Sequence, residues 1–378
     1  MLIERLTVQD FRNFAAAELE LGGRFTVLFG ENGAGKTNLI EALYLVSTLR
    51  SFRVSELAPL LRHGADEARV ELRGVDPALD LHTRLAVHLV RSERSLRRVA
   101  LADGKVVRSA TDFYGRARAI LFTPEDLGVL RGSPGGRRNF LDRVLFARDR
   151  AHIGDIQSYE KLLRSRNHVL KSEGNRASRD HLLETYEIGL AAAGARIWIR
   201  RERLLRELRP YFVAVFSQIH GAGRETSLAY DARLGEVPED ERERALLEAH
   251  VRRRSDDLIR GTTTTGPHRD DFVVRLDDQT VGDFASQGQT RALVLAFKIA
   301  ELRAARDLCG EPPLLLLDDV SSELDPTRNA QLFRALTEDA GQCVLTTTAP
   351  DFVRLGDAAE TAYVEVVGGT LRVVRRAS

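Results

Sequence analysis

The apolar residues in the middle of the chain recur at helical spacing. One long segment has apolar positions three, four or seven residues apart: Leu183, Tyr186, Leu190, Ala193, Ile197, Leu204 and Leu208. This spacing predicts a long amphipathic helix that ends or kinks near Pro210, because proline lacks a backbone N–H. Residues 239–259 predict a further helix. The region 123–260 is therefore expected to be mainly helical.

Strand-like patterns lie on either side of this region. Within residues 66–122, segments of alternating apolar and polar residues predict β-strands, and Asp103-Gly104 predicts a hairpin turn between two of them. The runs FTVLF (25–29) and LLLL (314–317) are continuously apolar, which is typical of buried strands in a parallel sheet. Strands combined with many helices predict an α/β fold.

A glycine-rich motif follows FTVLF. Residues 30–37 match G-x-x-x-x-G-K-[ST], and apolar residues at helical spacing come next. Strand, loop and helix in this order let backbone N–H groups surround a phosphate at a helix N-terminus. Lys36 is one of only five lysines in an arginine-rich chain, and its compact ammonium suits the β- and γ-phosphates. Thr37 offers a hydroxyl to Mg²⁺.

The loop is therefore expected to bind ATP with Mg²⁺; the plainer alternative is a glycine-rich turn before a helix. The expected nucleotide-binding residues are Gly30, Glu31, Asn32, Gly33, Ala34, Gly35, Lys36, Thr37 and Asn38.

Two acidic residues end the LLLL run. Asp318 and Asp319 would emerge at the carboxyl edge of a parallel sheet, where such sheets bind ligands. Asp318 fits the Mg²⁺ ligand that partners Thr37, and Asp319 fits the residue that orients or deprotonates the attacking water. With Lys36, these two carboxylates are the expected catalytic residues. An ordinary buried strand followed by a turn is the alternative.

A third motif, S-x-G-Q, opens a helix predicted to begin near Ser286 or Gln287. Ser286, Gly288 and Gln289 present a hydroxyl, free N–H groups and the positive end of a helix dipole, which together suit an anion. Taken alone, the four residues fit a plain helix N-cap better. One helix later comes the run with the two acids, and SSELDP (321–326) follows it directly.

The order of these four motifs resembles the ABC-type ATPase heads of the SMC superfamily. The resemblance implies that Ser286, Gly288 and Gln289 act in trans, closing over the γ-phosphate held by a second subunit. It also implies that SSELDP crosses the same interface. Only a homodimer formed on ATP would then contain complete sites.

Further segments resemble the RecF family of bacterial recombination mediators. They cover most of the chain: FRNF (11–14), GKTNLIEALYL (35–45), SFR (51–53), LFTPEDLGVLRGSPGGRRNFLD (121–142) and TTGPHRDD (264–271). The resemblance implies an ATP-dependent dimer that binds DNA, favouring junctions of single and double strands. It further implies action with RecR and RecO to place RecA on gapped DNA in repair, replication and the SOS response, with slow ATP hydrolysis opening the clamp.

The predicted domains follow from the long interval between the phosphate loop and the two acids. Residues 1–122 and 261–378 are expected to form the ATPase head, and residues 123–260 an inserted arm of about 40–50 Å at 1.5 Å per residue. A chromosome-holding SMC protein would have hundreds of residues of heptads here.

The chain departs from ABC heads at two places, and the first, at Asp319, is expected to slow hydrolysis. Asp319 replaces the usual glutamate, and Thr346, Thr347 and Thr348 stand where a histidine is expected. Thr347 or Thr348 is the weakly assigned γ-phosphate contact. FTPEDL, with Glu125 and Asp126, occupies the place of the usual Q-loop glutamine.

Composition limits the remaining function classes. A net charge of +1 predicts no global attraction to DNA, so a DNA site must be a local patch. Four arginine-rich stretches are candidates, although most of them are expected to be solvated helix faces: 91–98, 135–143, 196–209 and 250–254.

The sequence also bears on compartment and on other functions. There is no secretory leader and no apolar run of about 20 residues, and Cys309 and Cys343 fit packed thiols, so a cytoplasmic protein without a membrane partner is expected. The motor subunit of a membrane transporter and a small-molecule kinase are less favoured alternatives.

Overall fold

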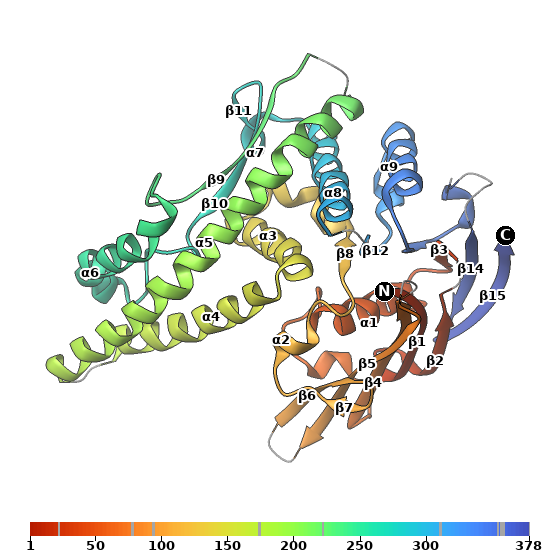
Figure 1. The fold of residues 1–378 in the computed structure, drawn as a ribbon, viewed down its shortest axis with the longest axis horizontal. Coiled ribbons are helices and arrows are strands. Elements are labelled where there is room, and N and C mark those ends of the chain that lie inside the picture. Colours follow the sequence, from red (N-terminus) through yellow and green to blue (C-terminus); the bar gives the residue numbers. More distant parts are fainter. Residues whose placement is uncertain are drawn as a thin grey trace. The chain divides into compact units, whose positions relative to one another are not determined.

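The computed structural model describes residues 1–21, 23–76, 79–92, 95–172, 175–220, 223–309, 312–353, 355 and 360–377. The chain forms two compact units. The first contains residues 1–127 and 291–378, and the second contains residues 128–290. Figure 1 shows the fold of the chain.

The first unit contains an antiparallel sheet with the strand order β2-β1-β4-β5-β6-β7. Its strands are β1 (Leu2–Phe11), β2 (Phe14–Glu20), β4 (Glu67–Asp76), β5 (Leu81–Ser92), β6 (Ser95–Ala102) and β7 (Lys105–Val106). Asp103 and Gly104 connect β6 to β7 with φ values of +51° and +79°. The hairpin turn predicted at these two residues is confirmed.

A second sheet in this unit has the order β15-β14-β3-β13-β12-β8. Its strands are β3 (Phe25–Phe29), β8 (Ala119–Phe122), β12 (Leu314–Leu317), β13 (Cys343–Thr347), β14 (Thr361–Val367) and β15 (Thr370–Ala377). All neighbouring strands pair in parallel except β14 and β15. The carboxyl ends of β3, β8, β12 and β13 therefore lie at one edge of the sheet. All four leucines of β12 are buried, as their sequence predicted.

Helix α1 (Lys36–Thr48) lies between the two sheets and contacts β4 and β5 of one sheet and β8, β12 and β13 of the other. Nearly all its residues after the first turn are buried, since both of its sides are covered. The remaining helices of this unit are α2 (Ala110–Phe113), α8 (Gln287–Cys309), whose first four residues belong to the second unit, and α9 (Pro326–Asp339). Arg303 of α8 donates to Asp339 of α9 at 2.7 Å, so these two helices lie side by side.

The second unit combines helices with a small antiparallel sheet of order β11-β10-β9. Its elements are α3 (Pro134–Arg148), α4 (Arg150–Lys171), α5 (Arg176–His220), α6 (Arg242–Arg260), α7 (Val281–Phe284), β9 (Thr226–Asp231), β10 (Asp271–Leu276) and β11 (Gln279–Thr280). α5 packs against α4, α6 and β9. The predicted helical character of residues 123–260 is confirmed, with β9 as an unpredicted strand.

The long helix was predicted to end or kink near Pro210, and an end there is wrong, because α5 continues to His220. Phe212, Val215 and Phe216 lie beyond the proline and are buried. Their burial offsets the one backbone hydrogen bond that proline cannot donate. At 45 residues, α5 measures roughly 68 Å, longer than the arm expected from the sequence.

The unit boundaries differ from the domain boundaries expected from the sequence. The structure divides the chain after residues 127 and 290 rather than after 122 and 260. Residues 261–290, expected in the head, lie in the second unit because β10 pairs with β9 and the turn at Thr263 bonds to α4.

Two smaller expectations concern cysteines and membrane spans. Cys343 is a buried free thiol, and the side chain of Cys309 lies outside the described part of the chain. Among the described residues, none of the helices has the length and apolar character required to cross a membrane.

Candidate functional site

The glycine loop joins the carboxyl end of β3 to the N-terminus of α1. Gly30 has φ +145°, and a Cβ there would lie 2.4 Å from the Val366 carbonyl oxygen. Gly35 has φ +117°, and a Cβ there would lie 2.7 Å from Asn13 Nδ2. Both positions therefore require glycine on grounds of backbone conformation and space. Residues 31–33, between them, are exposed to solvent.

Lys36 folds back over the loop from the first position of α1. Its Nζ donates to the carbonyl oxygens of Gly30 at 2.7 Å and Glu31 at 2.9 Å. Burial lowers the pKa of Lys36, while the charges of Asp319 and Asp318 oppose that shift. The ammonium is thus held at the loop, with acceptors that phosphate oxygens can replace.

Thr37 and Asp318 meet at the carboxyl edge of the sheet. Thr37 Oγ1 donates to Asp318 Oδ1 at 2.9 Å, and Thr346 Oγ1 donates to the same oxygen at 2.9 Å. Burial raises the pKa of Asp318, the two hydroxyls oppose the rise, and Asp319 and Glu125 reinforce it. The two proposed Mg²⁺ ligands therefore lie in hydrogen-bond contact.

Asp319 occupies an unusual backbone position beside this pair. Its φ is +48°, and its N–H donates to Thr346 Oγ1 at 2.8 Å. Its Oδ1 is buried and has no hydrogen-bond partner among the described residues. Burial raises the pKa of the Asp319 carboxyl, with Ser322 and Lys36 opposing the rise.

These features fit a triphosphate with a divalent cation. The unpartnered Asp319 oxygen can accept from a water, and a cation near Asp318 relieves the cost of two adjacent buried carboxylates. The described residues contain no group of three or more His, Cys, Asp or Glu that could hold a metal by itself. Mg²⁺ commonly takes few protein ligands and completes its shell with phosphate and water, so Thr37 and Asp318 suffice.

Further polar residues form hydrogen bonds to the glycine loop and to the start of α1. Asn13 Nδ2 donates to the Ala34 carbonyl oxygen at 2.9 Å, and Asn13 Oδ1 accepts from Asn38 Nδ2 at 2.7 Å. Arg53 donates to Asn38 Oδ1 at 2.8 Å. Arg12 makes two hydrogen bonds to the buried Glu41 of α1, at 2.6 and 2.7 Å. The segments FRNF and SFR thus meet around the start of α1, a role the sequence did not reveal.

Of the three consecutive threonines, only Thr346 contacts the acidic pair. Thr347 is buried and donates to the Ala349 carbonyl oxygen at 3.0 Å, whereas Thr348 is exposed. Leu317 pairs in register with Leu345, which places the next residue, Thr346, beside Asp318. Because this register cannot be read from the sequence, the sequence did not predict a role for Thr346.

In the FTPEDL segment, Asp126 has a local structural role. It is buried and accepts from the Thr123 N–H at 3.1 Å. Glu125 is exposed, and its charge acts on Asp318.

The S-x-G-Q motif lies in the second unit, where α8 begins at Gln287. Ser286 Oγ accepts from the Gln289 N–H at 3.2 Å, and Gln289 Oε1 accepts from the Ser286 N–H at 2.8 Å. This reciprocal pair is a capping box that fixes the start of the helix. Ser286 is exposed, and Gly288 and Gln289 are half-buried.

The SSELDP segment lies after β12 in the first unit. Arg291 Nη1 donates to the Glu323 carbonyl oxygen at 2.5 Å, and Asp325 caps α9 by accepting from the Arg328 N–H at 3.0 Å.

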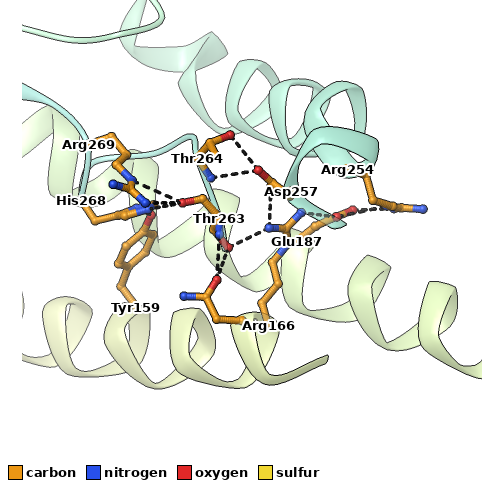
Figure 2. Close-up of polar contacts among 10 residues, drawn as sticks. Tyr159, Arg166, Glu187, Arg254, Asp257, Thr263, Thr264, His268 and Arg269 are labelled. Atoms are coloured by element: carbon orange, nitrogen blue, oxygen red, sulfur yellow. Dashed lines mark hydrogen bonds and ion pairs between the residues drawn. The ribbon is translucent and has the colours of Figure 1, made fainter. Parts of the chain in front are cut away.

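The GPHRDD segment takes part in a buried polar network. Figure 2 shows Arg166 of α4 between Glu187 of α5 and Asp257 of α6. Arg166 donates to Glu187 at 2.9 Å, to Asp257 at 2.8 Å and to Thr263 Oγ1 at 2.7 Å. His268 bonds to the Tyr159 hydroxyl at 2.7 Å and to the Thr263 carbonyl oxygen at 3.1 Å. Burial lowers the pKa of His268 to about 4. Arg166 therefore ties three helices together, and the GPHRDD segment joins this network through His268.

Most arginines in the candidate basic stretches bond to groups of their own unit. Arg201 is buried against Asp142 at 2.7 Å, and Arg137 donates to Asp271 at 2.8 Å. The others with such partners are Arg91, Arg98, Arg138, Arg196, Arg200, Arg203, Arg206, Arg209, Arg253 and Arg254. Much of the positive charge that suggested a DNA surface is therefore balanced within the fold.

Known proteins are similar to this chain along nearly its whole length. The family model for the RecF/RecN/SMC N terminal domain matches residues 2–366. A protein of Anaeromyxobacter sp. (strain Fw109-5), named DNA replication and repair protein RecF, is 42% identical over 98% of both chains. A protein of the same name from Myxococcus xanthus (strain DK1622) is 41% identical over 99% of this chain and 97% of its own.

Solved structures agree in fold. The structure described as the recombination mediator protein RecF-ATP in the RecFOR pathway has a TM-score of 0.86 and 28% identity, covering 99% of this chain and 98% of its own. An Smc head domain from Pyrococcus furiosus has a TM-score of 0.55 at 14% identity, a likeness of fold alone. From its sequence, its α/β fold and these full-length matches, the chain belongs to the RecF family of SMC-like ABC-type ATPases.

Proposed function

We propose that this protein is an ATP-dependent DNA-binding recombination mediator that works as a homodimer. The contact between Thr37 and Asp318, beside Lys36, carries the proposal, because it joins a phosphate loop to a cation-binding carboxylate. In this role Lys36 binds the β- and γ-phosphates, and Thr37 and Asp318 hold Mg²⁺. Asp319 orients the attacking water.

The first unit serves as the ATPase head, and the helical part of the chain serves as its arm. Ser286, Gly288 and Gln289 close over the γ-phosphate held by a second copy. The exposed serine at a helix N-terminus, fixed by its capping box, supports this assignment because helix N-termini favour anions. Weak hydrolysis then opens the dimer.

The role on DNA rests on family membership and on the names of its relatives. The protein binds gapped or junction DNA through phosphate contacts without sequence preference, and acts with RecR and RecO to support RecA loading. It serves gap repair, replication and the SOS response in the cytoplasm. A transporter motor or a metabolite kinase is disfavoured by the full-length match to proteins named for DNA replication and repair.

The test measures dimer formation and DNA retention with ATP, ADP or no nucleotide. Lys36→Arg is expected to impair nucleotide use, because a planar guanidinium fits the loop poorly. Ser286→Arg is expected to leave ATP binding intact and to abolish the ATP-dependent dimer. Since Ser286 also caps α8, Ser286→Asn serves as a control that retains a cap, and thermal unfolding checks the fold of each variant. A wild-type protein that stays monomeric under all three conditions removes the trans site.

A further inference from the structure

Phe284 is an exposed aromatic side chain close to the S-x-G-Q motif. Its exposed fraction is 67%. Every other phenylalanine whose side chain the structure describes is buried or half-buried. Exposed aliphatic residues are common on protein surfaces, but aromatic residues are enriched where proteins associate. The exposure of Phe284 therefore indicates a site where another molecule binds.

The fold holds Phe284 outward. It ends α7, a single turn that packs against β10 and β11 (Figure 1). Val281, at the start of this turn, is buried, and Ala285, just after it, is buried as well. Arg131 donates a hydrogen bond to the Ala285 carbonyl oxygen, and the Ala285 N–H donates to the Val281 carbonyl oxygen. A backbone rotation that turned Phe284 inward would expose both neighbours and break these bonds.

The same short segment presents the motif residue Ser286. Only Ala285 separates Phe284 from Ser286, and both flanking side chains are exposed. The capping box with Gln289 fixes Ser286 just as α7 fixes Phe284. Hot-spot residues cluster near the centre of an interface, so an apolar side chain beside a motif that meets a second copy is placed to act as an anchor.

The charges around Phe284 favour protein over nucleic acid as the occupant. Residues 276–290 include Asp277 and Asp278 and contain neither lysine nor arginine. Three arginines lie next to this segment, but Arg131 already bonds to the Ala285 carbonyl oxygen, Arg275 to the Asp278 carbonyl oxygen and Arg291 to Glu323. A base-stacking aromatic is normally accompanied by cations that hold the phosphates, and this segment supplies acids instead.

We propose that Phe284 packs against a second copy of this chain when two copies close on ATP, and that it is an apolar anchor of that interface. The proposal rests on the trans role of Ser286 in the proposed function. It adds a residue that touches no nucleotide and strengthens the dimer only.

The first experiment compares Phe284→Ser with Ile259→Ser in the full-length chain. Ile259 lies on α6, is 86% exposed and belongs to the same unit, so it controls for the loss of an exposed apolar group. Sedimentation velocity with a slowly hydrolysed ATP analogue gives the dimer dissociation constant. Phe284→Ser is expected to raise it about tenfold or more, and Ile259→Ser to leave it unchanged. The nucleotide affinity of each monomer is expected to equal that of the wild type.

A wild-type dissociation constant in Phe284→Ser overturns the inference while leaving the proposed function intact. A wild-type chain that never dimerises with nucleotide refutes the proposed function instead. A second experiment places the photoreactive amino acid benzoylphenylalanine at position 284 and irradiates with and without the analogue. The expected product is a crosslink between two copies that requires nucleotide. A crosslink to added DNA alone, or none in a dimeric sample, contradicts the proposal.

Discussion

Thr37 and Asp318 are 281 positions apart in the chain, yet the hydroxyl of one donates to the carboxylate of the other at 2.9 Å. Thr37 stands in the first turn of α1, and Asp318 directly follows β12. The parallel sheet brings them together because β3 and β12 both flank β13 and end at the same edge. The same carboxylate oxygen also accepts from Thr346, so two hydroxyls aim Asp318 at the loop.

Thr37→Val is expected to weaken the use of Mg²⁺. The substitution removes one hydroxyl at nearly constant volume, so a Mg²⁺ ligand is lost while the packing is kept. ATP hydrolysis should fall about tenfold or more and should require a higher Mg²⁺ concentration, measured by phosphate release across a Mg²⁺ titration.

Thr346→Val is the matched control for that change. Thr346 is not a proposed cation ligand, but its hydroxyl also accepts from the Asp319 N–H. Loss of this hydroxyl should lower the free energy of unfolding by about 1–2 kcal/mol. Because Thr346 only orients Asp318, its loss should raise the Mg²⁺ midpoint less than Thr37→Val does. If Thr37→Val shows the same Mg²⁺ midpoint as wild type, Thr37 is not a ligand.

Asp319→Asn is expected to separate ATP binding from ATP hydrolysis. Asparagine tolerates the left-handed backbone at φ +48°, so the turn after β12 should persist. An amide cannot take a proton from water, and hydrolysis should fall about a hundredfold or more. Nucleotide affinity, measured with a fluorescent ATP analogue, should remain, and the ATP-bound dimer should last longer. Wild-type turnover in Asp319→Asn would show that another group activates the water.

Local motifs made much of the fold and site predictable. The glycine loop and the acids after β12 each lie in a strand-and-turn pattern, and the geometry of a parallel sheet then requires their proximity. Contacts set by register or tertiary packing were not predictable. Thr346 was indistinguishable from its two neighbours, and the α5 helix passes through Pro210 because the residues beyond it are buried. Likewise, no local signal shows that Thr263 bonds to Arg166, nearly a hundred residues earlier.

Removing Arg166 is expected to be severely destabilising. Its guanidinium, Glu187 and Asp257 are all fully buried, so Arg166→Met leaves one carboxylate, that of Asp257, without a charged partner among the described residues (Figure 2). A broken buried ion pair costs about 3–5 kcal/mol of unfolding free energy. The measurement is urea unfolding followed by tryptophan fluorescence. Trp198 is the only tryptophan and lies buried in α5, so its fluorescence reports on this unit.

Arg244→Met provides the control for the loss of an arginine from the same unit. Arg244 of α6 is exposed and pairs with Glu241 at 3.2 Å. Its replacement should change the unfolding free energy by less than about 0.5 kcal/mol. Equal effects of the two substitutions would mean that the buried network contributes little to stability.

His250→Leu is expected to reduce the acid sensitivity of the second unit. Both ring nitrogens of His250 are buried without a hydrogen-bond partner among the described residues, and burial lowers its pKa to about 4. Arg166 adds to this shift, whereas Glu187 and Asp257 oppose it. The unfolded chain, with a histidine pKa near about 6.5, binds the proton more readily than the folded chain. The contribution of His250 to the free energy of unfolding is therefore fully present above the histidine pKa of the unfolded chain. This contribution is lost as the pH falls towards about 4, and the loss is about 3 kcal/mol at most.

Leucine has a similar volume and no titrating group, so in His250→Leu the unfolding free energy should fall less between pH 7 and pH 4.5. Part of the wild-type loss should persist, since burial also lowers the pKa of His268 to about 4. At pH 7 the variant should be at least as stable as wild type, because two unsatisfied nitrogens are removed.

In contrast, His268→Leu breaks the bonds to Tyr159 and Thr263 and should destabilise the unit at pH 7. Urea unfolding of both variants, followed by Trp198 fluorescence across this pH range, distinguishes the two histidines. An unchanged pH slope in His250→Leu would show that the ring is already solvated or paired in the folded protein.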